Sequence, residues 1–176
     1  TPMLAEHIAS QIYENFAFEP TPAQKNAIER LGGFLCGDAQ DRIFILNGYA
    51  GTGKTSLIAA LVKTLSGLRV RTILLAPTGR AAKVMSRYAG AKAYTIHKKI
   101  YRQKSLASED ASFSLDYNKE KGAVFIVDEA SMLSNYSSDG SIFGSGQLLE
   151  DLIAYIRKGC DCRLIVVGDS AQLPPV

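Results

Sequence analysis

The chain has 176 residues, of which 47% are hydrophobic and 21% are charged, a composition typical of one globular domain rather than of a disordered or fibrous protein. No apolar run approaches the roughly 18 residues of a membrane-spanning helix. The N-terminus lacks the pattern of a signal peptide, so we expect a cytoplasmic protein without a membrane partner. Three cysteines, Cys36, Cys160 and Cys162, lack the spacing of a zinc site, and we assign them no chemistry.

The formal net charge is only +3, but the charges are unevenly distributed. The 67 residues from Arg42 to Ser108 contain thirteen lysines and arginines and neither aspartate nor glutamate. Scattered, solvated lysines are one interpretation, but a segment of this length without a carboxylate is better explained by a polyanionic partner. We therefore expect phosphate-rich ligands to bind this part of the chain.

Two helices are predicted at the start of the chain. Apolar residues at helical spacing predict the first helix around residues 8–16. The second is predicted to run from its N-cap, Thr21, to Gly32. We assign residues 1–38 to this N-terminal helical segment and residues 39–176 to the main domain.

Apolar, strand-like runs then alternate with helical patterns, which is typical of an α/β fold with a mainly parallel sheet and helices on both faces. Two segments depart from this alternation. In residues 103–122, alternating apolar residues predict a short hairpin, and the serine- and glycine-rich residues 134–147 predict a loop. Strands are predicted within 42–48, 71–77, 122–130 and 162–169, and helices within about 54–65, 79–88 and 146–157.

Residues 48–56, with the sequence GYAGTGKTS, connect a predicted strand to a predicted helix. Gly48, Gly53, Lys54 and Thr55 fit the P-loop pattern G-x-x-x-x-G-K-S/T. In this pattern backbone amides surround phosphates, the lysine meets the β- and γ-phosphate charges and the hydroxyl binds Mg²⁺. A glycine turn with an incidental lysine is the weaker alternative. The expected nucleotide-binding residues of this segment are Gly48, Ala50, Gly51, Thr52, Gly53, Lys54, Thr55 and Ser56.

Two acidic residues follow the apolar run near residue 127. Asp128, at the end of a predicted strand, is expected to share Mg²⁺ with Thr55. Glu129 is expected to polarise the water that attacks the γ-phosphate. A helix cap followed by a first-turn acid would be the preferred interpretation if no P-loop preceded this pair. Because one does, the two motifs together predict hydrolysis of a nucleoside triphosphate.

The motifs and their order resemble those of the superfamily 1 DNA helicases of the RecD and Dda type. The matching segments are TPAQKNAI (21–28), GYAGTGKTS (48–56), APTGRAAKVM (76–85), TIHKKIY (95–101), VDEASML (127–133) and VVGDSAQLPPV (166–176). The resemblance implies a RecA-like P-loop NTPase domain that couples hydrolysis of ATP, with Mg²⁺, to 5′ to 3′ movement on single-stranded DNA in recombination or repair. RNA remains open as the track, since phosphate contacts do not distinguish the sugars. The resemblance also implies that Gln24 reads the adenine and that Gln172 senses the γ-phosphate. A solvent-facing helix residue is the alternative for Gln24.

A nucleic-acid face is expected from the charges and from the same resemblance. Thr78 is a predicted helix N-cap whose free amides suit a phosphate, and Arg80, Lys83 and Arg87 share one side of the helix that follows. The residues that the resemblance assigns to the single strand are Pro77, Thr78, Arg80, Thr95 and His97.

Two aromatic residues lie next to or within the segment TIHKKIY (95–101). Tyr94 and Tyr101 could stack on bases, but tyrosines at such positions are more often core residues. For His97, a half-buried, hydrogen-bonded ring is an equally good interpretation.

The resemblance sets further expectations about residues 103–121 and about the rest of the motor. This excursion occupies the position of a strand-separating pin in the family. The sequence stops at Val176 after the sixth motif, and the family places an essential arginine in a second RecA-like lobe. We therefore expect this fragment alone to bind Mg-ATP and to be nearly inactive. The rival interpretations are a P-loop ATPase or kinase with a substrate other than nucleic acid, and a non-catalytic interaction module.

Overall fold

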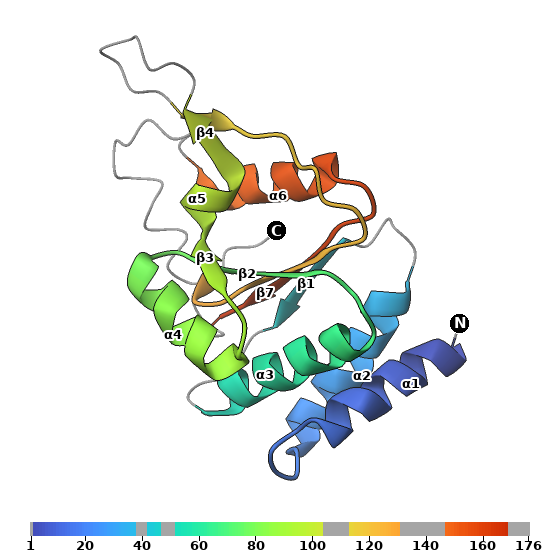
Figure 1. The fold of residues 1–176 in the computed structure, drawn as a ribbon. Helices are drawn as coiled ribbons and strands as arrows, with labels where there is room; N and C mark the ends of the chain where they lie inside the picture. Colours follow the sequence, from blue (N-terminus) through green and yellow to red (C-terminus); the bar gives the residue numbers. More distant parts are fainter. Residues whose placement is uncertain (1, 38–41, 47–51, 104–112, 131–146, 169–176) are drawn as a thin grey trace.

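The computed structural model describes residues 2–37, 42–46, 52–103, 113–130 and 147–168. Within these residues the chain forms a five-stranded parallel sheet with the strand order β1-β7-β6-β2-β3 (Figure 1). A separate antiparallel pair is formed by β4 and β5. The α/β class and the mainly parallel sheet predicted from the sequence are confirmed.

The helices are α1 (Pro2–Glu14), α2 (Pro22–Cys36), α3 (Thr52–Gly67), α4 (Gly79–Ala89), α5 (Ile96–Ile100) and α6 (Leu148–Lys158). The strands are β1 (Ile43–Leu46), β2 (Thr72–Ala76), β3 (Ala93–Thr95), β4 (Tyr101–Gln103), β5 (Phe113–Leu115), β6 (Val124–Val127) and β7 (Arg163–Val167).

Helices cover both faces of the sheet because the central strands are apolar on both sides. In β6, Val124 and Ile126 belong to the core shared with α1, α2, α3 and α4. Phe125 and Val127 belong to the core shared with α5 and α6. Figure 1 shows α3 and α4 below the sheet and α6 above it. The helical segment at the N-terminus therefore shares one hydrophobic core with α3, the helix that follows the predicted P-loop.

All four predicted strands are present, each shorter than the apolar run that predicted it. Strand β3 was not predicted, because its three residues are only half-buried and occupy the edge of the sheet beside β2. Helix α2 continues to Cys36, beyond the predicted end at Gly32. Its predicted beginning is confirmed, since the Thr21 side chain accepts a hydrogen bond from the Gln24 amide.

The antiparallel pair lies where a hairpin was predicted. Tyr101 faces Leu115, and Gln103 faces Phe113. The pairing therefore begins two residues before the predicted excursion. Residues 104–112, which connect the two strands, lie outside the described residues, as do residues 134–146 of the predicted loop.

Helix α1 approaches α2 closely at Gly32. A Cβ atom at this position would lie 2.5 Å from the backbone oxygen of Ala5, whereas a Cβ at the neighbouring Gly33 would meet no atom within 4 Å. Gly33 is exposed and Gly32 is buried. The two glycines thus form a matched pair on one helix, one required by packing and one not.

We expect Gly32→Ala to lower the free energy of unfolding by about 1–3 kcal/mol, because α1 must move away from α2. Gly33→Ala is expected to raise it by about 0.5–1 kcal/mol, because alanine has the higher helix propensity. Denaturation in urea measures both values. Equal stability of the two variants would contradict the close packing of α1 on α2.

Within the described ranges, no helix combines the length and the apolar character needed to cross a bilayer. The same residues contain no group of three or more histidines, cysteines, aspartates or glutamates arranged to hold a metal ion. Cys162 is buried, which raises the pKa of its thiol, and Cys160 is exposed.

Candidate functional site

The candidate nucleotide site lies at the carboxyl end of the parallel sheet. Lys54 is in the first turn of α3, which follows β1, and Asp128 directly follows β6. Strand β7 lies between β1 and β6 in the sheet. Because parallel strands end at the same edge, these distant parts of the sequence meet there. Lys54 Nζ lies 3.0 Å from Asp128 Oδ1 and 3.4 Å from Glu129 Oε1.

The ion pair between Lys54 and Asp128 is well shielded from water, since their side chains are 12% and 6% exposed. Burial alone would lower the pKa of the Lys54 ammonium. The hydrogen bond from Lys54 to Asp128, together with the charges of Asp128 and Glu129, outweighs burial and raises that pKa. Lys54 is therefore cationic, and its ammonium pairs with the carboxylates of Asp128 and Glu129.

Asp128 is held by three donors. Its Oδ1 atom accepts hydrogen bonds from Lys54 and, at 2.8 Å, from the backbone amide of Glu129. Its Oδ2 atom accepts a hydrogen bond from the Tyr88 hydroxyl at 2.5 Å. Such a network fixes the orientation of the carboxylate.

Tyr88 is the functional candidate that the sequence reasoning missed. Burial raises the pKa of its phenol, and the charge of Asp128 raises it further, so the hydroxyl stays protonated and donates. Tyr88 lies three residues after the buried Met85 and therefore on the inner side of α4. That spacing places it in the core, but nothing in the sequence names Asp128 as its partner.

Glu129 occupies an unusual backbone conformation. Its φ angle is +59°, in the left-handed region that residues with a Cβ rarely adopt. Its side chain is 45% exposed, whereas that of Asp128 is nearly buried. The turn after β6 thus directs one carboxylate inward to Lys54 and leaves the other accessible to water, and the backbone strain is stored at this point.

Gln24 is 4% exposed, so the solvent-facing alternative for this residue is wrong. Its Oε1 atom accepts a hydrogen bond from the Thr21 amide at 2.8 Å, completing a capping box. The amide group of Gln24 is therefore fixed by the start of α2. Its contact with adenine stays a prediction.

The remaining nucleotide residues divide into two groups. Gly53, Lys54, Thr55 and Ser56 all lie in the first turns of α3, where backbone amides without helical partners can bind an anion. Thr52 is the first residue of this helix. Gly48, Ala50, Gly51 and Gln172 lie outside the described residues.

Two helix N-termini form the candidate nucleic-acid face, at the ends of neighbouring strands β2 and β3. Thr78 caps α4 by accepting a hydrogen bond from the Ala81 amide at 3.1 Å. Thr95 caps α5 by accepting one from the Lys98 amide at 3.2 Å. Arg80 is exposed, whereas Pro77 is buried.

The aromatic residues near this face differ in role. Tyr101 is 7% exposed and donates a hydrogen bond to Asp151 at 2.6 Å, which makes it a core residue rather than a platform for bases. Tyr94 is half-buried, with the Lys92 ammonium 5.1 Å from its ring centre. Burial lowers the pKa of His97, which favours the neutral form of its ring at neutral pH.

We expect Tyr88→Phe to raise the Mg²⁺ concentration needed for half-maximal ATP binding about tenfold, because Asp128 loses the donor that orients it. ATP binding without Mg²⁺ is expected to stay unchanged. Titration of Mg²⁺ against a fluorescent ATP analogue measures the shift. Tyr94→Phe, which removes a hydroxyl from another half-buried tyrosine, is the control and is expected to match the parent. An unshifted Tyr88→Phe curve would make Tyr88 a purely structural residue.

Comparison with known proteins identifies the family. A family model described as an AAA domain matches residues 20–176. The chain is 31% identical over 163 residues to the ATP-dependent RecD2 DNA helicase of Deinococcus radiodurans, covering 89% of this chain and 19% of the relative. It is 32% identical over 134 residues to the ATP-dependent DNA helicase Dda of Enterobacteria phage T4, covering 74% of this chain and 28% of the relative.

A third relative, the multifunctional conjugation protein TraI of Escherichia coli, is 30% identical over 143 residues, which are 77% of this chain and 7% of that protein. The chain thus spans less than a third of each of these relatives. The family match itself covers nearly the whole chain and includes both the P-loop and the acidic pair. The chain therefore belongs to the AAA domain family, in the group formed by the N-terminal RecA-like lobe of RecD- and Dda-type superfamily 1 helicases.

Proposed function

We propose that this chain is the ATP-binding motor lobe of a helicase that moves 5′ to 3′ on single-stranded DNA in recombination or repair. The observation that carries this proposal is the contact between Lys54 and Asp128 at the carboxyl end of the sheet. It joins the two halves of a phosphate site at the place where open α/β sheets bind ligands. The relatives from Deinococcus radiodurans and phage T4 are ATP-dependent DNA helicases, which supports DNA as the track.

In this proposal the first turn of α3 receives the phosphates of ATP. The amides of residues 53–56 and the Lys54 ammonium bind them, and Gln24 contacts the adenine. The Thr55 hydroxyl and the Asp128 carboxylate are the hard oxygen donors that Mg²⁺ prefers, so these residues fit the ion. When bound, Mg²⁺ would neutralise charge on the β- and γ-phosphates.

Hydrolysis requires Lys54 to exchange its carboxylate partners for phosphate. Glu129, released from the 3.4 Å contact with Lys54, can then accept a proton from water. The water oxygen forms a bond to the γ-phosphorus as the bond from that phosphorus to the bridging oxygen breaks, and the water proton passes to Glu129. Gln172 is proposed to sense the γ-phosphate.

Helix α4 is proposed to couple the strand to the nucleotide. Its N-cap, Thr78, and Arg80 in its first turn belong to the candidate nucleic-acid face, and Tyr88 in its last turn contacts Asp128. A phosphate of the single-stranded DNA that binds at the start of α4 therefore contacts the same helix that, through Tyr88, contacts Asp128, the proposed Mg²⁺ ligand. Pro77, Thr95 and His97 complete the proposed face.

The proposed division of the chain is an N-terminal segment (1–38) and a RecA-like lobe (39–176), with an inserted excursion (103–121) that acts as a pin. We further propose a second RecA-like lobe as partner in the complete protein, and action in the cytoplasm. Deletion of residues 105–119 is expected to keep strand-stimulated hydrolysis and to abolish unwinding. Loss of nucleotide binding in this deletion would contradict the pin.

The test of the proposed function is ATP binding and hydrolysis by the complete protein with and without oligo(dT). We expect oligo(dT) to stimulate hydrolysis strongly, and the present chain alone to bind Mg-ATP while hydrolysing it slowly. An equal effect of oligo(U) would extend the track to RNA. Rapid hydrolysis that ignores both oligonucleotides would instead favour an ATPase or kinase with another substrate.

A further inference from the structure

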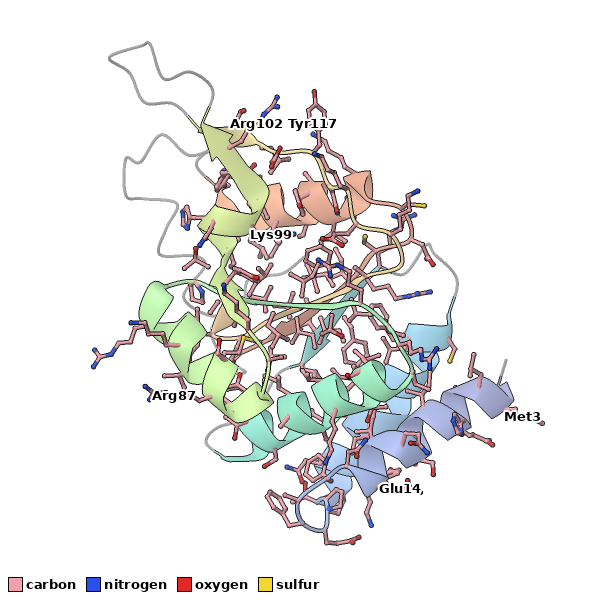
Figure 2. The ribbon with its side chains drawn as sticks, viewed as in Figure 1. Met3, Glu14, Arg87, Lys99, Arg102 and Tyr117 are labelled. Carbon is pink, nitrogen blue, oxygen red and sulfur yellow. The ribbon has the colours of Figure 1, made fainter. Side chains whose placement is uncertain are left out.

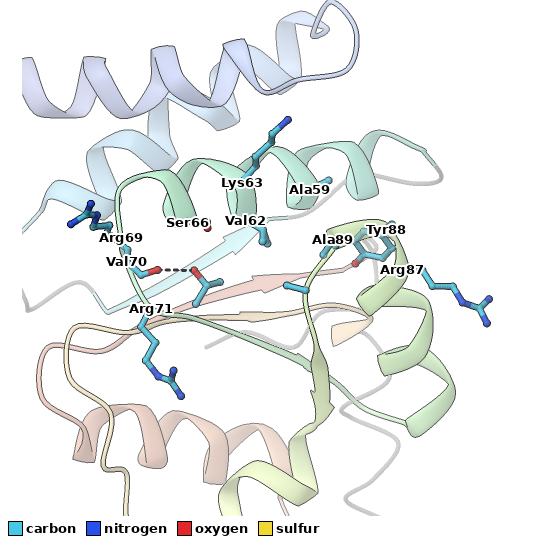
Figure 3. A pocket seen from close by; sticks show the side chains of 13 residues that line it. Ala59, Val62, Lys63, Ser66, Arg69, Val70, Arg71, Arg87, Tyr88 and Ala89 are labelled. Atoms are coloured by element: carbon cyan, nitrogen blue, oxygen red, sulfur yellow. Dashed lines mark hydrogen bonds between the residues drawn. The ribbon is translucent and has the colours of Figure 1, made fainter.

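Two adjoining depressions lie beside the amino ends of β2 and β3, and the larger one reaches Tyr88 of the candidate site. The larger one has a volume of about 780 Å³ and lies between α3, α4 and the turn before β2 (Figure 3). The smaller one, about 420 Å³, follows the edge of β3. Both are lined by Arg71, Thr72 and Ala91, so they form one continuous surface, which we name the basic groove.

The basic groove is rich in cations, and the described residues that line it include no carboxylate. Glu120, which lies beside it, pairs with Arg71 and Lys99. Within the described ranges, the other five cations take part in no ion pair. The lysines and arginines that line the groove are Lys63, Arg69, Arg71, Arg87, Lys92, Lys98 and Lys99.

The larger depression of the groove lies away from the candidate nucleic-acid face, whereas the smaller one extends to Lys98 and Lys99, close to Thr95. Thr78 and Thr95 lie at the carboxyl ends of β2 and β3, whereas Arg71 and Lys92 lie at the amino ends. Five residues of β2 separate the two regions by about 16 Å. The cations of the larger depression, Lys63, Arg69, Arg71 and Arg87, therefore lie outside the segments that are predicted to contact the single strand.

The lining of the groove indicates which polyanion it fits. The polar contacts that the groove can offer come mainly from lysines and arginines, whose natural partners on a nucleic acid are the phosphates. The two aromatic lining residues are otherwise engaged, because Tyr88 donates to Asp128 and the Tyr94 ring faces the Lys92 ammonium. Contacts are thus left to phosphates alone, which is how proteins bind a duplex without reading its sequence.

The direction of the cations distinguishes a nucleic acid from an inserted peptide. In Figure 3, Lys63 and Arg87 extend from the rim away from the hollow, while small residues such as Ala59, Val62 and Ala89 lie at its walls. Outward-pointing cations on several sides suit a broad polyanion lying across the rim. Figure 2 likewise shows Arg87 extending from the surface of α4.

We propose that the basic groove binds the phosphate backbone of duplex DNA while the single strand occupies the face formed by Thr78 and Thr95. This inference rests on the proposed function, because it assumes that the chain acts on DNA. Arg87 lies about 10 Å along α4 from Arg80, so this helix connects the duplex surface to the single-strand face. The groove would hold the double-stranded part of a substrate that the motor approaches.

The test uses the triple variant Lys63→Gln, Arg69→Gln, Lys92→Gln, which changes exposed groove residues outside the nucleotide site and strand face. Fluorescence anisotropy measures its binding to a blunt 20-base-pair duplex and to oligo(dT) over a range of salt concentrations. The control triple is Lys119→Gln, Arg157→Gln, Lys158→Gln, which removes the same charge from exposed residues outside the groove. Binding of Mg-ATP confirms that each variant is folded.

We expect the groove variant to bind the duplex about tenfold more weakly than the parent. The slope of log affinity against log salt is expected to fall by about one for each phosphate that the variant no longer neutralises. Binding of oligo(dT) is expected to stay within about twofold, and the control triple is expected to match the parent on both ligands.

Unchanged duplex binding, or an equal loss on duplex and oligo(dT), would overturn the inference. Tighter binding of a poly-glutamate peptide than of the duplex, abolished in the groove variant, would also overturn it and assign the groove to an acidic protein. Absence of oligo(dT) binding by the parent would instead refute the proposed function, so the two failures can be told apart.

Discussion

The Lys54→Ala variant is expected to lose ATP hydrolysis in the complete protein, with a fall in kcat of at least about 10²-fold. In the proposed mechanism Lys54 is the cation that binds the β- and γ-phosphates, and charge stabilisation of this kind is worth about 10²–10³ in rate. Phosphate release in the presence of oligo(dT) measures the loss. Hydrolysis at more than a tenth of the parental rate would contradict the assigned role.

The same substitution has a second consequence, for the protein without nucleotide. Lys54 is the partner of a nearly buried Asp128, and removing one member of a buried pair costs about 3–5 kcal/mol. Two other donors, Tyr88 and the Glu129 amide, stay on Asp128 and reduce this cost. We expect a loss of about 1–3 kcal/mol in the free energy of unfolding.

Two companion variants separate charge from shape. Lys54→Arg keeps a cation beside Asp128 and is expected to retain most of the stability. It is not expected to restore ATP hydrolysis, because the planar, wider guanidinium does not fit the position of the Lys54 ammonium between the phosphates. Asp128→Asn, combined with Lys54→Ala, removes both charges and is expected to recover stability relative to Lys54→Ala alone. Urea unfolding of the parent, Lys54→Ala, Asp128→Asn and the double variant forms a double-mutant cycle. A coupling energy near zero would show that the ion pair does not stabilise the fold.

Much of the candidate site could be predicted because it depends on strong local patterns. The apolar run before the glycine-rich segment and the apolar run before Asp128 predicted two parallel strands, and parallel strands end at one edge. The meeting of these side chains follows from topology alone. The same logic predicted the helix caps Thr21 and Thr78, because capping depends on neighbouring residues.

The parts that the sequence did not predict depend on contacts between distant residues. Tyr88 contacts Asp128, which lies 40 positions later in the sequence, and no spacing within α4 reveals this partner. Strand β3 has three residues at the edge of the sheet, too few for a periodic signal. The positive φ of Glu129 also leaves no trace in composition, since the residue type is one that this conformation disfavours.

Helix α4 gives these observations a common physical meaning. The N-cap of α4, Thr78, belongs to the candidate nucleic-acid face. The outer side of the helix carries Arg80, Lys83 and Arg87, the last of which lines the basic groove, and Tyr88 in its last turn donates a hydrogen bond to Asp128. A rigid helix with ligand contacts at both ends transmits a displacement rather than absorbing it. We therefore propose that a strand bound at the start of α4 changes, through Tyr88, the orientation of Asp128.

Glu129→Gln is expected to lower kcat about 10²- to 10⁴-fold while the affinity for Mg-ATP changes little, because only the proton acceptor is removed. Single-turnover hydrolysis and equilibrium binding of an ATP analogue separate the two quantities. This pattern differs from that of Lys54→Ala, for which binding also weakens. Loss of ATP binding in Glu129→Gln would contradict a role limited to the attacking water.

Glu129→Gly tests the strained backbone independently of the chemistry. Glycine adopts φ near +60° without a steric cost, whereas a residue with a Cβ is destabilised there by about 1–3 kcal/mol. Glycine also loses more conformational entropy on folding, which reduces its advantage by about 0.5–1 kcal/mol. Glu129→Gly is therefore expected to be about 1 kcal/mol more stable than Glu129→Gln, although both lack the carboxylate and both fail to hydrolyse ATP. A glutamate at a position whose backbone suits glycine is consistent with the chemical role proposed for its carboxylate. Equal stability of the two variants would remove the strain and, with it, this reason for assigning Glu129 a chemical role.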